Sequence, residues 1–341
     1  MKRFAFIVHL RDIKDIAHTI PLLPNFIITK IFKKPILWLM RNVKGRAGFI
    51  VRSRFSAGEN VEGHIIVIWL TGKQIISGNS FTRKRIKEAV VYAQEELGCD
   101  IIGLGALTAS VTRSGKWLAS QKEINATITH GDSYAVAMAI EGINKIVEKQ
   151  KINLKHCKMA IVGASGIIGS PLSQYFASRC RCKEVIAIAR RRRKLERVAL
   201  TCEGKVTIET DLKRVQEADI VVTATSAPGA IIGSEDLKEG AVVYEVAQPR
   251  NVPERVKDER EDVLIVDGAY VKVPEDIKFW WMSLPPQKTF GCMAETMILA
   301  IEEVKENKVG SVDLDFVEKI KKIGDKHGFG HAELTSFNKK I

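Results

Sequence analysis

One seven-residue stretch constrains the fold of this chain more than any other feature. An apolar run at 159–162 is typical of a buried strand, and it leads directly into a loop with three glycines, after which we expect a helix over 167–178. Glycine has no Cβ, so the backbone of such a loop can approach a phosphate closely, and the first N–H groups of the helix can bind it. The sequence therefore predicts a strand–loop–helix unit that holds the pyrophosphate of a dinucleotide. The loop residues expected to bind it are Gly163, Ala164, Ser165, Gly166, Ile167, Ile168 and Gly169.

The spacing of the loop is G-x-x-G-x-x-G, so Ala164 takes the first position of the dinucleotide fingerprint if Gly166 and Gly169 take the other two. Short β-branched runs follow the loop at regular intervals, with a helical pattern at 193–200. Runs of this kind are typical of parallel strands that are covered on both faces. We therefore predict an α/β fold with a Rossmann domain over residues 151–275. The further strands are expected at 185–189, 220–223, 242–246 and 263–267.

The end of the second strand indicates which dinucleotide is bound. NAD-binding domains place a carboxylate there for the ribose 2′-hydroxyl, whereas this chain has Arg190, Arg191 and Arg192, followed by another arginine and a lysine. Cations at a helix start oppose the helix dipole, which favours a bound 2′-phosphate over a merely solvated helix face. We expect NADPH as the cofactor. The small residues Thr225 and Ser226 after the strand at 220–223 are expected near the nicotinamide ribose, unless they form only an ordinary Pro-Gly turn, and Ala247 completes the predicted cofactor set.

The rest of the chain predicts an α/β substrate domain over residues 1–150 and a C-terminal helical segment over 276–341. The first has apolar strand patterns and helices in alternation, and the second has two helical patterns. The expected strands are 4–8, 64–70 and 101–105, and the expected helices are 82–97, 132–148, 292–306 and 313–326.

Composition limits the function classes. With 53 Lys and Arg against 40 Asp and Glu, the net charge is +13, but the basic residues are spread along the chain, which argues against a nucleic-acid-binding arm. The six cysteines lack metal-ligand spacing, so we expect no metal site and a reducing, cytoplasmic location. The uncharged stretch Ile16–Thr29 has 14 residues, whereas a helix that spans a bilayer needs about 20. Residues 20–40 mix apolar and basic side chains, and either a lid or core segment or a surface for a membrane or an apolar substrate would explain them.

Cys292 is the candidate nucleophile. It falls in the first turn of the helix predicted at 292–306, where the helix dipole and the N–H groups of the turn stabilise a thiolate. A small packed cysteine is the alternative interpretation of the same position.

The chain resembles the long-chain fatty acyl-[acyl-carrier-protein] reductases of cyanobacteria, which form fatty aldehydes. The matching motifs are Phe6-Ile-Val-His-Leu10, Leu104-Gly-Ala-Leu-Thr-Ala-Ser110, Thr129-His-Gly-Asp-Ser-Tyr134, the glycine loop, Ala247-Gln-Pro-Arg-Asn-Val252, Phe290-Gly-Cys-Met-Ala-Glu295 and Lys326-His-Gly-Phe329. The resemblance implies an NADPH-dependent thioester reductase in which Cys292 takes the acyl group from acyl carrier protein or acyl-CoA. His130 and Ser133 are then candidates for stabilising or protonating the oxyanion, with a helix cap or a core polar group as the alternative role for each.

The chain departs from that family in two motifs and in the insert-like segment Ile20–Met40. It has Ile128-Thr-His-Gly-Asp132 where the family is expected to have Thr-Thr-Gly-Asn, and Ile167 replaces an aspartate of the glycine loop. An acyl chain needs an apolar tunnel, which residues 20–40 and Trp280-Trp281-Met282 are expected to line. The excess positive charge suits an acidic carrier protein as partner.

The sequence is also compatible with three other functions. A shikimate-dehydrogenase-like NADP oxidoreductase would need a Lys/Asp pair in the first domain, where none stands out. Glutamyl-tRNA-reductase chemistry would need a nucleophile in that domain, where Cys99 is available. A non-catalytic, membrane-peripheral NADPH-binding protein is the third alternative, and the sequence assigns no oligomeric state.

Overall fold

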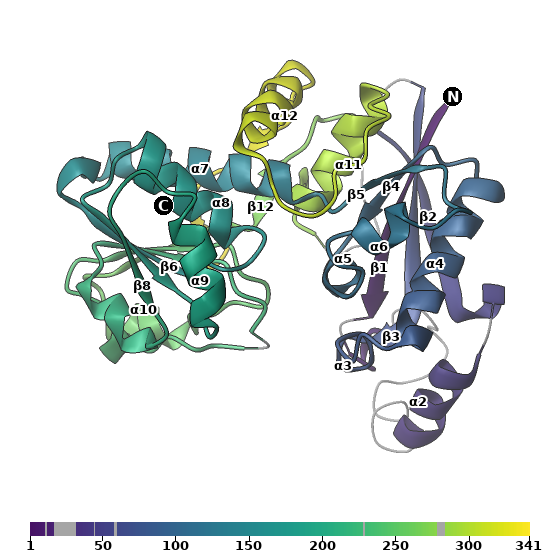
Figure 1. The fold of residues 1–341 in the computed structure, drawn as a ribbon, viewed down its shortest axis with the longest axis horizontal. Helices are drawn as coiled ribbons and strands as arrows, with labels where there is room; N and C mark the ends of the chain where they lie inside the picture. Colours follow the sequence, from purple (N-terminus) through teal and green to yellow (C-terminus); the bar gives the residue numbers. More distant parts are fainter. Residues whose placement is uncertain (11, 17–31, 44, 58–59, 228, 278–283) are drawn as a thin grey trace. The chain divides into compact units, whose positions relative to one another are not determined.

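The computed structural model describes residues 1–10, 12–16, 32–43, 45–57, 60–227, 229–277 and 284–341. The chain forms two compact units (Figure 1). Unit 1 comprises Met1–Gly131, Val273–Gln287 and Cys292–Ser311, and unit 2 comprises Asp132–Lys272, Lys288–Gly291 and Val312–Ile341. The segment Trp280–Met282 and most of the segment 20–40, which the sequence assigns to an acyl tunnel, lie outside the described residues.

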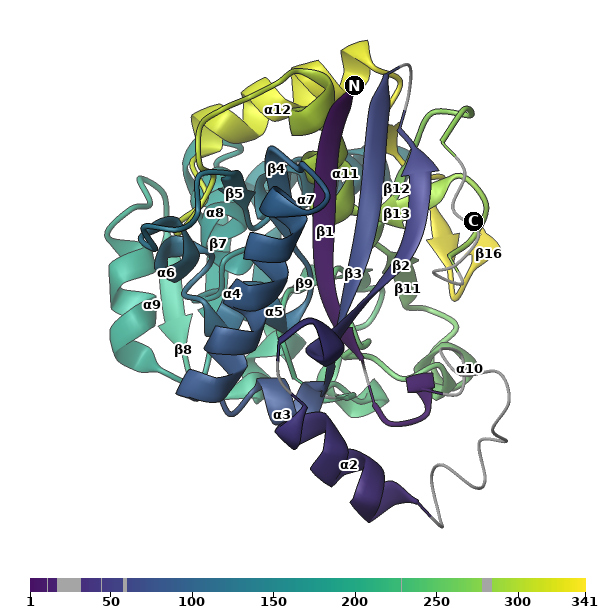
Figure 2. The same cartoon turned by 90° about the vertical axis from the view of Figure 1, so that its right-hand side faces the viewer.

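Unit 1 is built on a five-stranded sheet in the order β2-β3-β1-β4-β5, part of which faces the viewer in Figure 2. All neighbouring strands are parallel except β2 and β3, which are antiparallel. The three strands expected from the sequence are the central ones, β3, β1 and β4. The strands are β1 (Lys2–Leu10), β2 (Phe49–Ser56), β3 (Val61–Thr71), β4 (Ile101–Leu104) and β5 (Thr127–Thr129).

Helix α4 (Ser80–Glu95) covers this sheet as the helical pattern at 82–97 predicts. Its apolar positions recur at helical spacing, so Ile86, Ala89, Val90 and Ala93 are all buried in one core with strand residues. Full burial of a side chain such as Ile86 or Val90 contributes about 1.5–3 kcal/mol to folding, and the smaller alanines contribute less. The other helices assigned wholly or mainly to unit 1 are α2 (Lys33–Asn42), α3 (Gly72–Ile75), α5 (Leu107–Val111), α6 (Lys116–Ala119) and α11 (Gly291–Ile301).

Unit 2 is built on a six-stranded, fully parallel sheet in the order β11-β10-β9-β6-β7-β8. Counted within the unit, this is the 3-2-1-4-5-6 order of dinucleotide-binding domains, in which the ligand lies where the strand order reverses, here at the carboxyl ends of β6 and β9. The Rossmann prediction is confirmed. The strands are β6 (Lys158–Val162), β7 (Glu184–Ile188), β8 (Val206–Glu209), β9 (Ile220–Thr223), β10 (Val242–Glu245) and β11 (Leu264–Asp267).

The helices of unit 2 keep the predicted positions but not all of the predicted ends. The helix expected at 167–178 begins at Gly169 and changes from α- to π-helical geometry at Tyr175. The helices are α7 (Asp132–Lys149), α8 (Gly169–Gln174) with the π-helical Tyr175–Arg179, α9 (Arg192–Ala199), α10 (Arg255–Glu259) and α12 (Leu314–Lys326). Small antiparallel strands complete the unit, namely β12 (Tyr270–Lys272), β13 (Lys288–Phe290), β14 (Gly330–His331), β15 (Thr335–Ser336) and β16 (Lys339–Lys340).

The two units do not coincide with the three ranges 1–150, 151–275 and 276–341 expected from the sequence. Helix α7 belongs to unit 2, and the residues expected to form a separate C-terminal segment are divided between the units. Close packing explains both assignments. A Cβ on Gly324 of α12 would lie 2.6 Å from the Tyr134 ring of α7, and a Cβ on Gly103 of β4 would lie 2.0 Å from Oγ1 of Thr296 in α11.

Candidate functional site

The glycine loop is a close-packed turn at the carboxyl end of β6. Gly163 has φ +94°, and a Cβ there would lie 2.5 Å from the carbonyl oxygen of Ala224, so only glycine fits. A Cβ on Gly169 would lie 2.3 Å from the carbonyl oxygen of Gly163, which places the start of α8 directly on the turn. The assignment of the first fingerprint position to Ala164 is therefore corrected: the tight turn falls at Gly163, and Ala164 is buried in the core.

Backbone hydrogen bonds fix this loop beside the neighbouring strands. The N–H groups of Gly163 and Ala164 both donate to the carbonyl of Ile188, at 2.8 and 3.1 Å, and Gly166 N–H donates to the Gly163 carbonyl at 2.8 Å. Gly166 is exposed, and Ser165, Ile167 and Ile168 are partly exposed. A loop with backbone open to solvent in front of a helix start, at the point where the strand order reverses, fits a dinucleotide pyrophosphate.

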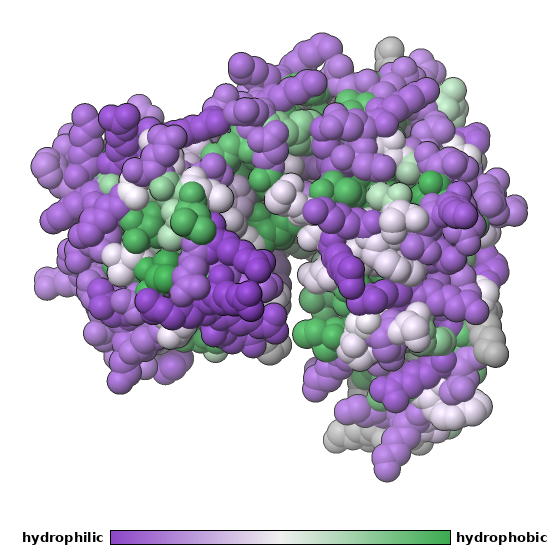
Figure 3. Space-filling view, in the orientation of Figure 1, coloured by the Kyte–Doolittle hydropathy of each residue, from purple (hydrophilic) through white to green (hydrophobic). Residues whose placement is uncertain are grey.

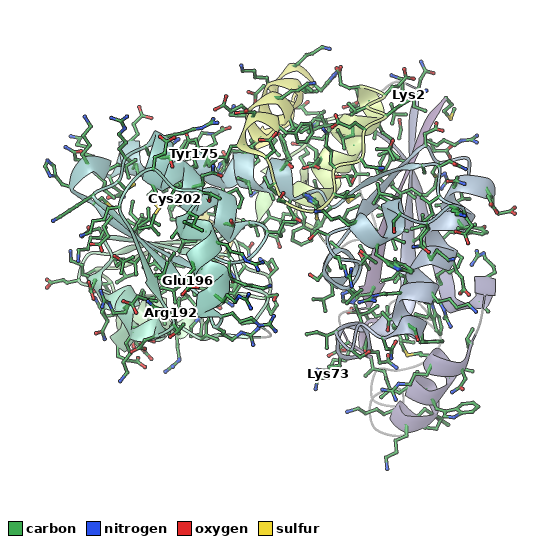
Figure 4. All side chains as sticks on the ribbon, in the orientation of Figure 1. Lys2, Lys73, Tyr175, Arg192, Glu196 and Cys202 are labelled. Carbon is green, nitrogen blue, oxygen red and sulfur yellow. The ribbon has the colours of Figure 1, made fainter. Side chains whose placement is uncertain are left out.

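The predicted 2′-phosphate site lies in the segment between β7 and α9. Arg190 and Arg191 are exposed there, and Arg192 begins α9. Figure 4 shows Arg192 and Glu196 on this helix, where they form an i,i+4 pair with 3.8 Å between Nε and Oε1. Because β7 is the neighbour of β6 in the sheet, this cluster stands where an adenosine ribose would be held. A guanidinium group binds phosphate with two parallel hydrogen bonds, so the cluster fits NADP(H).

The residues predicted near the nicotinamide have three different environments. Thr225 donates its hydroxyl to Oδ1 of Asn251 at 2.7 Å, whereas Ser226 is exposed. Ala247 is buried, and its N–H donates to the carbonyl of Thr223 at 3.0 Å. Thr225 and Ala247 therefore shape the loops at this edge of the sheet, and Ser226 has its side chain available to a ligand.

A buried carboxylate that is not among the residues predicted from the sequence holds these loops together. Glu245 at the end of β10 accepts hydrogen bonds from the Thr223 hydroxyl and from the N–H groups of Asn251 and Val252, the latter two at 3.1 and 2.9 Å. Burial raises the pKa of the Glu245 carboxyl, and these hydrogen bonds oppose that shift. An acidic residue at the end of a short apolar strand is the signal by which Glu245 is recognised.

Cys292 is the second residue of α11 and is partly exposed. The other five cysteines are poor candidates for a nucleophile, because burial raises the pKa of each thiol and only the thiolate reacts. The pKa rises to about 12 for Cys99, Cys157 and Cys182, and it is also raised for Cys180 and Cys202. Cys99 is 1% exposed, which argues against the alternative in which it would be the nucleophile.

The end of β5 packs directly against Cys292. Gly131 has φ +76°, and a Cβ on it would lie 2.4 Å from the Cα of Cys292. Its N–H donates to Oγ1 of Thr129 at 2.9 Å, and that hydroxyl donates to Oε1 of Glu295 at 2.6 Å. Thr129 and Glu295 are fully buried. A chain of hydrogen bonds thus ties the 129–131 turn to α11 one helical turn beyond the cysteine.

The sequence alone does not assign Thr129, Gly131 or Glu295 to the site. The signal available for Glu295 is its i+3 spacing from Cys292, which puts both on one face of the helix. The contact with Thr129 spans 166 positions of the chain, and no local pattern predicts it.

The two predicted polar partners of Cys292 belong to different units. His130 lies in unit 1 between Thr129 and Gly131, and its side chain is buried. Its backbone N–H donates to the carbonyl of Lys308 at 3.0 Å. Ser133 lies in unit 2 in the first turn of α7, and it is also buried. Within unit 1, then, the structure brings His130 to the turn that contacts Cys292.

Among the described residues, no helix combines the length and the apolar character needed to cross a bilayer.

Comparison with known proteins gives distant relationships. The shikimate/quinate 5-dehydrogenase family matches residues 145–268, which contain the six-stranded sheet. The chain is 28% identical over 314 residues to the aminotransferase PigE of Serratia sp., covering 89% of this chain and 36% of that protein. It is 27% identical over 269 residues to the long-chain acyl-[acyl-carrier-protein] reductase of Synechococcus elongatus (74% and 77%), and 25% identical over 253 residues to the glutamyl-tRNA reductase of Methanoculleus marisnigri (69% and 54%).

The chain thus spans about a third of the length of one of these relatives and about half of another. Together with the strand order, the glycine loop and the arginine cluster, these similarities support an NAD(P)-dependent reductase, and NADP(H) is the cofactor of unit 2.

Proposed function

We propose that this chain reduces a long-chain fatty acyl thioester to the fatty aldehyde with NADPH, through an S-acyl intermediate on Cys292. One observation carries the proposal. Cys292, in the first turn of α11, is partly exposed, and the turn that packs on it is held by the buried Thr129–Glu295 hydrogen bond. The 27% identity to an acyl-[acyl-carrier-protein] reductase supports this choice among NADP(H)-dependent reactions.

The first half of the reaction needs only groups of unit 1 and the substrate. The Cys292 thiolate attacks the thioester carbonyl carbon, and the carbonyl oxygen takes the negative charge. Backbone N–H groups of the first turn of α11 stabilise this oxyanion. The carbon–sulfur bond to the donor then breaks, so the donor leaves as a thiolate, takes up a proton, and leaves the acyl group on Sγ of Cys292.

The second half returns the cysteine. The glycine loop and Arg190–Arg192 would hold NADPH, which would supply a hydride for the acyl carbon. The oxygen takes up a proton to give a thiohemiacetal on Cys292. When that hydroxyl loses its proton again, the bond between carbon and Sγ breaks, the aldehyde leaves, and Cys292 is again a thiolate.

His130 is the first candidate for the group that supplies the proton. It lies between Thr129, which bonds to Glu295, and Gly131, which packs on Cys292. Ser133, the buried second residue of α7, is the second candidate. A His130→Gln variant that accumulates the acyl-enzyme but releases aldehyde slowly would assign the proton transfer to His130.

Acyl carrier protein is the donor that fits the charge of the chain. The net charge of +13 attracts an acidic partner, and this attraction is screened by salt. The rate with acyl carrier protein as donor should therefore fall steeply with added salt, while the rate with a short acyl-CoA changes little.

NADPH oxidation with a series of acyl-CoA chain lengths, together with extraction of the product, tests the function. The proposal expects aldehyde in a one-to-one ratio with NADPH oxidised. Oxidation coupled to a small hydroxy acid in place of any thioester would identify the shikimate-dehydrogenase-like alternative. NADPH binding without turnover on any thioester would identify the non-catalytic one.

A further inference from the structure

Helix α2 and the neighbouring α3 form an exposed surface that contains neither Cys292 nor the glycine loop. We call it the α2 patch and define it by its exposed apolar and basic residues. Of the seven large apolar side chains that are exposed in the described part of the chain, four belong to it. Its members are Phe32, Lys33, Lys34, Trp38, Leu39, Arg41, Lys73 and Ile76.

The apolar members are far more exposed than their chemistry favours. Trp38 is 66% exposed, Leu39 48% and Phe32 47%, and Ile76 at the end of α3 is 66% exposed. Isolated exposed apolar side chains are common on proteins, but a cluster on one short helix indicates a surface that binds something apolar. Figure 3 shows strongly hydrophilic and paler surface side by side at the end of unit 1 that carries α2.

The helix is anchored, so the exposed side chains are not a consequence of a loose segment. Met40 is fully buried, and Nε2 of Gln74 donates to the carbonyl of Leu37 at 3.3 Å. Gln74 is itself fixed, because its Oε1 accepts from the Thr71 N–H at 2.9 Å in the capping box of α3. One side of α2 is therefore attached to unit 1, and the side with Trp38 and Leu39 faces solvent.

The charged members of the α2 patch, Lys33, Lys34, Arg41 and Lys73, are all basic. Between Asp15 and Glu59 the sequence has no acidic residue and eight basic ones, which is eight of the thirteen net positive charges. The eight are Lys30, Lys33, Lys34, Arg41, Lys44, Arg46, Arg52 and Arg54. Lys73, labelled in Figure 4, adds a further cation from α3. The complementary partner is anionic.

We propose that the α2 patch binds the surface of an anionic lipid bilayer. Tryptophan prefers the membrane–water interface, leucine and phenylalanine enter the acyl-chain boundary, and lysine and arginine attract anionic headgroups. Nucleic acid would account for the cations but not for the four exposed apolar side chains. A helix of ten residues is too short to span a bilayer, so α2 lies on the surface. The inference does not depend on the proposed activity, because binding needs neither thioester nor NADPH.

Flotation of the full chain with vesicles tests it. The chain should float with vesicles of phosphatidylcholine mixed with phosphatidylglycerol, and much less with vesicles of phosphatidylcholine alone. The Trp38→Ala/Leu39→Ala variant should bind the mixed vesicles more weakly than the unaltered chain by a factor of roughly ten or more. Leu200→Ala, which removes an 86% exposed leucine in unit 2, should bind like the unaltered chain.

The charge contribution has its own pair of variants. Lys33→Gln/Lys34→Gln should weaken binding to the mixed vesicles by about fivefold per removed charge. Lys319→Gln/Lys322→Gln, which removes two exposed lysines of α12, should have little effect. Circular dichroism melting shows whether each variant is folded.

Three results would overturn the proposal. The first is that the unaltered chain does not float with the mixed vesicles at low salt. The second is that the Trp38→Ala/Leu39→Ala variant binds the mixed vesicles as tightly as the unaltered chain. The third is that the unaltered chain binds neutral vesicles as tightly as mixed ones. A dimer in light scattering that becomes monomeric in the Trp38→Ala/Leu39→Ala variant, without vesicle binding by either, would assign the patch to contacts between two copies of this chain.

Discussion

At the residue scale, the position of Cys292 depends on a backbone contact that only glycine permits. The Gly131 backbone lies where a Cβ would be 2.4 Å from Cα of Cys292, and its φ of +76° is strained for any other residue. A non-glycine residue with such a φ costs about 1–2 kcal/mol by itself. The clash with Cys292 adds to that cost.

Gly131→Ala is therefore expected to displace the cysteine. The rate of alkylation of Cys292 by iodoacetamide, followed by mass spectrometry, should fall by about tenfold or more, and aldehyde formation should fall with it. Gly45→Ala is the matched control, because Gly45 has φ +58° but nothing within 4 Å of an added Cβ. If both variants lose stability equally and Cys292 reacts at the unaltered rate in each, the contact has no role in positioning.

Thr129 is expected to act through the same turn. Thr129→Val removes the hydroxyl that joins Gly131 N–H to Glu295, leaving a buried carboxylate without this donor. Loss of such a bond lowers the free energy of unfolding by about 1–3 kcal/mol. Because the turn would then hold Cys292 less firmly, kcat should fall by about tenfold while KM for acyl-CoA changes little. Thr129→Ser keeps the hydroxyl and should restore kcat. A fall in Tm without a change in kcat would leave Thr129 a purely structural residue.

At the scale of elements, the segment between β7 and α9 selects the cofactor. Replacing Arg190, Arg191 and Arg192 by glutamine should raise the KM for NADPH by more than about tenfold and leave the KM for NADH nearly unchanged, because only NADPH has the 2′-phosphate. Arg197→Gln, on the exposed face of the same helix, should change neither value. Equal effects on both cofactors would show that the cluster does not contact the 2′-phosphate.

The elements that the sequence predicts well are those with a strong local pattern. The five strands expected in unit 2 are apolar, β-branched runs, and they appear within one or two residues of the expected positions. The sixth strand, β8, was missed because all four of its residues are only partly buried at the edge of the sheet. Strand β5 was missed because three residues are too short to show a period.

Contacts between distant parts of the chain were not predictable from local pattern. The order of the strands follows from pairing across the sheet, and the assignment of α7 to unit 2 follows from its packing with α12. For the candidate site, the local signals gave the loop, the arginines and Cys292. The turn at Thr129 and Gly131 needed the structure, because it meets α11 through long-range contacts.

At the scale of the whole molecule, the C-terminal residues help to close unit 2. Asp267 at the end of β11 accepts a hydrogen bond from the Thr335 hydroxyl at 2.7 Å, and it pairs with Arg250 at 2.6 Å. Nε2 of the buried His331 lies 2.8 Å from the Tyr244 hydroxyl. A Cβ on Gly142 of α7 would collide with both of these side chains, so three distant segments meet at this point.

The burial of His331 makes stability depend on pH. Burial lowers the pKa of His331 from 6.5 to about 4, with Lys145 adding to the shift. A histidine whose pKa is lowered by folding binds its proton more readily in the unfolded chain, so stability is lost as the pH falls from about 6.5 to about 4. The loss amounts to roughly 3 kcal/mol.

Urea unfolding at a series of pH values checks this. The His331→Gln variant should have a smaller loss of stability than the unaltered chain between these two pH values, and His156→Gln, at an exposed position, should keep the full loss. The same pH dependence in His331→Gln would assign the acid sensitivity to other groups.

The proposed reaction requires that Cys292 carries the acyl group before reduction. The most direct measurement is intact-protein mass spectrometry after mixing the chain with a long-chain acyl-CoA in the absence of NADPH. The proposed route predicts one added acyl mass that maps to Cys292, disappears when NADPH is added with release of aldehyde, and is absent from Cys292→Ala. A Cys292→Ala variant that still forms aldehyde would contradict it.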